Sequence, residues 1–197
     1  MTLTLDSKDT DMGFAPADPT DGRVPGEWES RYPPAAARHI RLEATYLAVL
    51  LATSVAGLLF LWYYIDRPLL GLSAQRYCTL CRYAFAWLSG LMGGTLFSLK
   101  WLYHSTARNL WNQDRRLWRF ATPHLSSALA FLCICLIRSG LFTILNPDAP
   151  QRLSVVVAVG FLTGYFSDTA LAKFAEIAYT LFGTGEKHQK GKQEDEH

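Results

Sequence analysis

The chain has 197 residues, of which half are apolar and only 18% are charged, below the roughly 25% typical of soluble domains. Its formal net charge of +2 provides no broad basic field, so the composition argues against nucleic acid as a partner. Four cysteines are too few for the disulfide framework of a small secreted domain. Together with the apolar segments described next, these values predict an all-α integral membrane protein.

The first apolar segment follows a polar N-terminal stretch. Residues 1–34 are rich in Asp, Pro, Gly and Thr and have no hydrophobic period, which predicts a disordered cytoplasmic tail. Ala44–Ile65 contains no charged residue and is bounded by Glu43 and Asp66. A helix rises about 1.5 Å per residue, so this segment is long enough to cross a hydrocarbon core about 30 Å thick. We predict that it is the first of four transmembrane helices.

The second apolar segment, Tyr83–Leu99, carries small residues at every fourth position. These are Ala86, Gly90, Gly94 and Ser98. A helix places them on one face, where another helix can approach closely inside a membrane. Gly160 and Gly164 repeat this spacing later in the chain. We expect both sets to be helix-packing faces, and they favour a homo-oligomer.

The linker over residues 104–119 is polar but compatible with a helix. Trp111 and Trp118 are seven positions apart and would share a helix face, and Arg115, Arg116 and Arg119 lie close to them in sequence. Tryptophan at the membrane boundary and arginine at lipid phosphates are typical of an interfacial amphipathic helix. We predict that these five residues contact lipid headgroups; an ordinary charged loop is the alternative.

Two further apolar segments complete the predicted bundle of four membrane helices. Phe120–Leu145 predicts the third span and Leu153–Phe166 the fourth. The chain then continues either as one long tilted helix or through a kink into a second interfacial helix. We favour a kink between Gly164 and Asp168, with Ser167 or Asp168 capping the new helix.

Basic residues gather on one side of the predicted spans. The larger group comprises Arg31, Arg38, Arg41, Lys100, Arg108, Arg115, Arg116, Arg119, Lys173, Lys187, Lys190 and Lys192. The smaller group comprises Arg67, Arg76, Arg82 and Arg152. Because Lys and Arg are enriched in cytoplasmic loops, both termini are predicted to be cytoplasmic. The membrane domain is predicted over residues 35–183, followed by a disordered charged tail over 184–197.

Arg138 and Asp168 are ionisable residues within the apolar segments. Such residues are costly in lipid and usually face a bundle interior, a partner or water. We therefore consider them candidates for lining a pore; alternatively, Arg138 snorkels outward and Asp168 lies at the inner interface. No cluster of His, Cys, Asp and Glu has metal-ligand spacing, so no metal site is predicted.

Cys78 and Cys81 form a CxxC pair at the predicted start of the second span, a spacing that suits thiol redox chemistry. This stretch resembles the bacterial disulfide-bond oxidoreductases, four-helix membrane proteins that pass electrons to quinone from a CxxC opening their second helix. The resemblance implies that the pair reduces quinone, the cofactor of this alternative. The family also uses a second cysteine pair in its second outer loop, and residues 146–152 contain no cysteine. Its quinone-side arginine would fall on Phe85.

The segment Trp111–Arg119, with the stretch Gly164–Asp168, is similar to small bacterial multi-pass membrane proteins that have no assigned activity. The resemblance implies a bacterial origin, which with the predicted spans gives an inner-membrane location. No Ser/His/Asp set, HExxH motif or phosphate-cradling loop is present, so we do not expect an enzyme.

The sequence therefore favours a homo-oligomeric pore or membrane-perturbing component without a cofactor, serving as an effector in a bacterial defence or stress system. Its expected partners are the lipid bilayer and a membrane or soluble regulator. The alternatives are the thiol oxidoreductase and a non-catalytic membrane scaffold.

Overall fold

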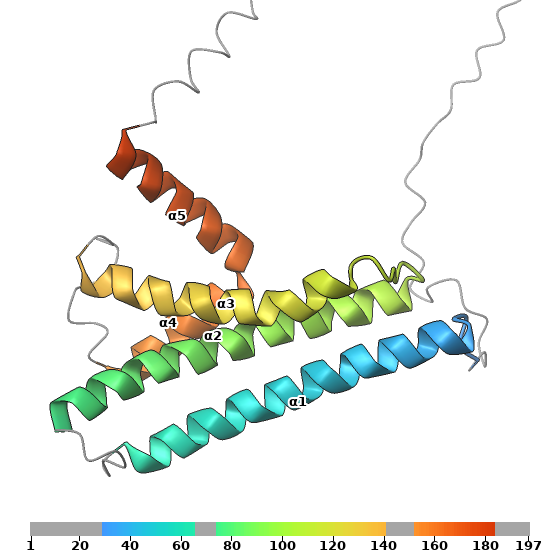
Figure 1. The fold of residues 1–197 in the computed structure, drawn as a ribbon, viewed down its shortest axis with the longest axis horizontal. Coiled ribbons are helices and arrows are strands. Elements are labelled where there is room, and N and C mark those ends of the chain that lie inside the picture. The colour runs from blue at the N-terminus through green and yellow to red at the C-terminus, as the bar shows by residue number, and fades with distance from the viewer. Residues whose placement is uncertain (1–28, 66–73, 141–151, 184–197) are drawn as a thin grey trace, which may run out of the picture.

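The computed structural model describes residues 29–65, 74–140 and 152–183, which contain five helices and no strand (Figure 1). The all-α prediction is confirmed for these residues. Residues 1–28 of the predicted tail over 1–34, the predicted tail over 184–197, and the stretches 66–73 and 141–151 lie outside the described residues.

Helix α1 (Pro34–Tyr64) contains the first predicted span and the helical lead-in before it. Proline suits the start of a helix, because the backbone N–H that it lacks would have no partner there. The helix is long and apolar enough to cross a membrane, and only 11% of the residues in its most apolar 18-residue stretch are buried. Helix α1 therefore lies along one side of the bundle and faces outward over most of its length.

Helix α2 (Ala74–Ala107) is the central helix, in contact with α1, α3 and α4. It covers the predicted span Tyr83–Leu99, yet it is not among the helices apolar enough to count as a span. Its Gly, Ser, Thr and Tyr residues lower its mean hydropathy, and many of them face neighbouring helices. By length and composition, the described part of the chain has two candidate spans, α1 and α3, or three if α4 and α5 form one broken span.

Helix α3 (Arg116–Arg138) is the second clear candidate span and runs beside α2. The prediction of one helix over residues 104–119 is wrong, because α2 continues to Ala107 and residues 108–115 form no helix. Asn109 has a left-handed backbone conformation with φ of 55°, which asparagine tolerates better than most residues and which cannot continue a helix.

Helices α4 (Leu153–Tyr165) and α5 (Ser167–Phe182) meet at Phe166 and are bent by 98°, which confirms the kinked interpretation. The predicted cap is wrong, because Phe166 is at the N-cap and no side chain caps α5. Asp168 instead lies in the first turn, where its negative charge is favourable to the helix dipole. Figure 1 shows α5 leaving the bundle.

The predicted small-residue faces lie between helices of the same chain. Gly90 and Gly94 face α3, where an added Cβ would overlap Ala130 and Ser126. The Gly160 and Gly164 positions face α2, where an added Cβ would overlap the Ser89 hydroxyl and the Gly90 carbonyl oxygen. Ala86 and Ser98 are fully buried as well. These faces serve packing as predicted, but inside one chain, so they give no support to a homo-oligomer.

Candidate functional site

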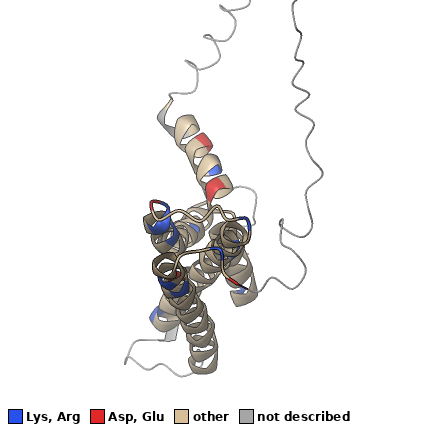
Figure 2. Cartoon of the chain, turned by 90° about the vertical axis from the view of Figure 1, so that its right-hand side faces the viewer, with Lys and Arg blue, Asp and Glu red and all other residues tan. Residues whose placement is uncertain are grey.

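Three helix ends meet at one end of the bundle: the start of α1, the end of α2 and the start of α3 (Figure 1). Figure 2 looks onto this end, where several segments of the ribbon carry the blue of Lys and Arg. The basic residues of these helix ends are Arg38, Arg41, Arg108, Arg115, Arg116 and Arg119. They all belong to the group predicted to be cytoplasmic.

A buried ion-pair cluster centred on Glu43 joins α1 to α3. The Glu43 side chain is 1% exposed and Arg119 is 4% exposed. The Arg119 Nε donates to Glu43 Oε2 at 2.8 Å, and its Nη2 donates to Oε1 at 3.3 Å. The Trp111 indole donates to Oε2 at 3.3 Å, and Arg116 Nε lies 3.6 Å from Oε1. Such close pairing is what makes a buried carboxylate tolerable.

Further hydrogen bonds fix the turn between α2 and α3. Arg119 Nη2 donates to the Asn112 carbonyl oxygen at 3.1 Å, and the Trp111 backbone N–H donates to the Tyr32 hydroxyl at 3.3 Å. That hydroxyl lies 3.4 Å from the Ser105 carbonyl oxygen at the end of α2. Tyr32, inside the predicted tail, thereby ties the segment before α1 to this turn.

Sequence reasoning missed this cluster. Three of the residues predicted to contact headgroups, Trp111, Arg116 and Arg119, contact Glu43 instead. Arg116 Nη1 also lies 3.0 Å from His39 Nδ1. A signal was present, because Arg116 and Arg119 are three positions apart and share a helix face. An acidic partner is favourable for two cations on one helix face, and Glu43 lies directly before the uncharged stretch of α1.

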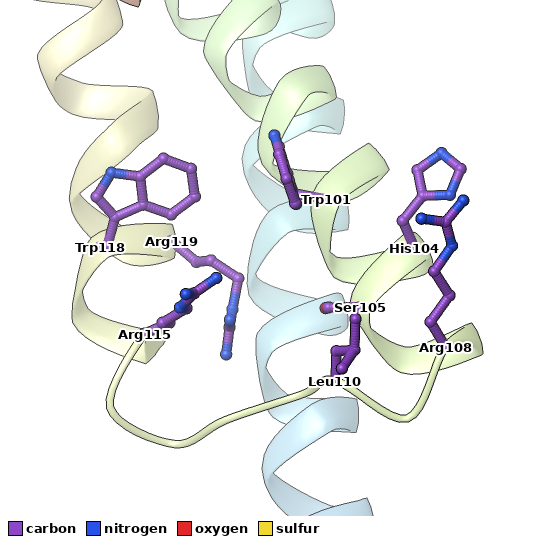
Figure 3. A pocket seen from close by; sticks show the side chains of 8 residues that line it. All are labelled: Trp101, His104, Ser105, Arg108, Leu110, Arg115, Trp118 and Arg119. Carbon is purple, nitrogen blue, oxygen red and sulfur yellow. The ribbon is translucent and has the colours of Figure 1, made fainter. Parts of the chain in front are cut away.

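A cavity of about 490 Å³ lies beside the cluster, between the end of α2 and the start of α3 (Figure 3). It is lined by Trp101, His104, Ser105, Arg108, Leu110, Arg115, Trp118 and Arg119. Three of the five predicted headgroup residues, Arg115, Trp118 and Arg119, are therefore brought together at this cavity. The two tryptophans supply apolar walls, and the basic side chains supply positive charge.

A second cavity of about 390 Å³ shares Trp101, His104 and Arg108 with the first. Its other lining residues are Phe97, Lys100, Tyr165 and Phe166. The Lys100 Nζ donates to the Tyr165 hydroxyl at 3.4 Å, which joins α2 to the end of α4. We call the two adjoining cavities, together with the residues that line them, the basic groove.

Arg138 and Asp168 do not come together and do not face the bundle interior. Arg138 is the exposed last residue of α3, and its guanidinium lies 5.5 Å from the centre of the Tyr83 ring. Asp168 is also exposed, and it borders a small cavity with Trp118 and Thr122, near the opposite end of α3. The geometry therefore does not support the two residues as parts of one polar path.

The Cys78 and Cys81 thiols lie near the start of α2 and form no disulfide. Helix α2 begins at Ala74, so the free backbone N–H groups of its first turn precede Cys78. Cys81 is buried against the core with Tyr77 and Phe85. No group of three His, Cys, Asp or Glu residues that suits a metal ion occurs within the ranges that the structure describes.

Comparison with protein-family models, curated proteins and solved structures finds no match for this chain. What the chain does is therefore to be inferred from the geometry of the site. That geometry comprises an ion-pair cluster that fixes one end of the bundle and a basic groove with apolar walls beside it.

Proposed function

We propose that the chain is a non-enzymatic protein of the bacterial inner membrane that acts on the bilayer itself. In this proposal α1, α2, α3 and α4 cross the membrane, and α5 lies on its cytoplasmic surface. The apolar lengths of α1 and α3 support the crossings, and α2 is packed between them. The basic residues at the shared end of α1, α2 and α3 support the orientation.

The observation that carries this proposal is the direction and exposure of α5. The helix is bent by 98° from α4, so it runs along the membrane surface if α4 crosses the membrane. Leu171, Phe174 and Ala178 fall on one side, and the ion pair of Lys173 with Glu176, at 2.7 Å, falls on the other. Amphipathic helices of this kind insert their apolar side at the boundary of headgroups and acyl chains, which disturbs one leaflet.

A homo-oligomeric pore is the second form of this proposal. Because the small-residue faces are used inside one chain, copies would meet through the outer face of α1, where Val49, Leu59 and Phe60 are exposed. A membrane or soluble regulator would control the assembly in the proposed defence or stress role.

Dye release from liposomes tests the role of α5. We expect purified full-length protein to release the dye, and the double variant Leu171→Glu/Ala175→Glu, at two exposed positions on the apolar side of α5, to reduce release at least about fivefold, since charged side chains are costly in the acyl region. The matched control Thr169→Glu/Thr180→Glu adds the same charge to the polar side of α5 and should release dye like the wild type. Liposomes that stay sealed with wild-type protein, or equal losses in both variants, would contradict the proposal.

The oxidoreductase alternative has a separate test. Oxidation of the Cys78–Cys81 pair would form one disulfide while quinone takes up two electrons and two protons. We expect reduced protein mixed with a water-soluble quinone to keep all four of its thiols, because Cys81 is buried in the core. Thiol titration measures this result. Loss of two thiols from the wild type, but none from Cys78→Ser/Cys81→Ser, would establish the alternative.

A further inference from the structure

The basic groove carries positive charge that the described residues do not neutralise. Arg108 and Arg115 are both exposed, and neither forms an ion pair with a carboxylate within the described ranges. Arg119, by contrast, lines the same groove with its charge already compensated by Glu43. In the first cavity the uncompensated charge therefore comes from two sides, from Arg108 just after the end of α2 and from Arg115 at the start of α3 (Figure 3). Lys100 adds a third positive charge in the second cavity.

The start of α3 adds a second feature that favours an anion. Arg115 is at the N-cap of α3, no side chain caps the helix, and its first turn contains no acidic residue. The first backbone N–H groups of a helix lack partners within it, and such helix ends attract anions. This end borders the groove, because Arg115 and Trp118 line it. Arginine also suits phosphate, since its planar guanidinium donates two parallel hydrogen bonds.

The other walls of the groove are apolar and indicate an amphiphile. Trp101 and Trp118 are half-exposed in the first cavity, and Phe97 and Phe166 line the second. A hydrated inorganic ion gains nothing from such walls, whereas a lipid brings hydrocarbon next to its phosphate. Tryptophan is typical of the membrane–water boundary, where lipid phosphates lie.

We propose that the basic groove binds the phosphate headgroup of one anionic phospholipid. Arg108 and Arg115 hold the phosphate from opposite sides, and Trp101 and Trp118 contact the glycerol and the upper acyl chains. The inference rests on the proposed membrane location, but it does not depend on membrane perturbation by α5.

Native mass spectrometry of the full chain in a neutral detergent, with added phosphatidylglycerol, tests the site. We expect one lipid to bind tightly and Arg108→Gln/Arg115→Gln to weaken binding about tenfold or more, as for the loss of charge-assisted hydrogen bonds. The matched control Arg38→Gln/Arg41→Gln removes the same charge from the same end of the bundle. Both of its arginines lie outside the groove, so it should bind within about twofold of the wild type.

Equal binding by the wild type and Arg108→Gln/Arg115→Gln would overturn the site, and so would equal losses in the two double variants. Should the double variant lose its helical circular dichroism, the single variant Arg115→Gln replaces it and should still bind about threefold more weakly. Millimolar inorganic phosphate should leave the lipid bound, and full displacement would overturn the lipid assignment. Binding is measured without liposomes, so failure of this inference and failure of the dye-release prediction are distinguishable.

Discussion

Replacing Glu43 by Gln will destabilise the bundle by about 3–5 kcal/mol, the range for breaking a buried ion pair by removing one partner. Glutamine has nearly the same shape, so the change removes charge without leaving a cavity. Arg119 would then keep a buried guanidinium without its counter-charge, with Arg116 close by. We expect a clear fall in the unfolding midpoint of detergent-solubilised protein, measured by far-ultraviolet circular dichroism.

The exposed pair of Lys173 and Glu176 provides a matched control. Their side chains are 64% and 67% exposed, so Glu176→Gln makes the same chemical change in a solvated pair and should cost less than about 1 kcal/mol. The double variant Glu43→Gln/Arg119→Gln should be more stable than Glu43→Gln, because it leaves no unpaired charge from that pair. Equal midpoints for Glu43→Gln and Glu176→Gln would show that the cluster contributes little.

The same cluster positions the walls of the groove. Arg119 belongs to both, and the turn that carries Asn112 is bonded to its guanidinium. Since Trp111 in that turn also donates to Glu43, the turn and the start of α3 are held against α1 together. We therefore expect Glu43→Gln to weaken lipid binding as well, through the spacing of Arg108 and Arg115 rather than through a direct contact.

The parts of the fold that could be predicted from the sequence are those set by local composition. The apolar lengths of α1 and α3 identified them as candidate spans, and glycine with polar residues near Phe166 indicated the bend before α5. The central helix α2 was predicted as a span over Tyr83–Leu99, but it is not among the helices apolar enough to count as one. Its small and polar residues face other helices, and they lower the mean hydropathy of the helix. The end of α2 was missed because it depends on the left-handed backbone of Asn109.

The candidate site was predicted in part. Arg115, Trp118 and Arg119 lie near one another in sequence and line the same groove, while their predicted contact with lipid headgroups stays a prediction. The partner of Arg119 was missed because Glu43 is 76 positions away in the sequence. The periodicity of apolar residues indicates helix faces, but it does not indicate contacts between residues so far apart. Arg138 was placed inside a span because the apolar segment was expected to continue to residue 145, whereas α3 ends at Arg138.

Replacing Gly164 by Ala will destabilise the bundle by about 1–3 kcal/mol, as overpacking of a close contact does. An added Cβ would overlap the Gly90 carbonyl oxygen on α2, and a backbone atom cannot rotate away. The matched control is Gly57→Ala in α1, where the Cβ would lie 3.0 Å from the end of the flexible Leu88 side chain. Alanine favours a helix over glycine by about 0.5–1 kcal/mol, so this control should be as stable as the wild type within about 1 kcal/mol.

The Gly164→Ala variant also distinguishes helix packing within one chain from helix packing between two copies of the chain. If the Gly160 and Gly164 face joins α4 to α2 of the same chain, Gly164→Ala lowers the unfolding midpoint and leaves the molar mass of the detergent complex unchanged. If that face joins two copies, the molar mass falls while the midpoint at high dilution stays the same. Light scattering coupled to size-exclusion chromatography measures the mass. We expect the first result, because the close approach of Gly164 to Gly90 occurs within one chain.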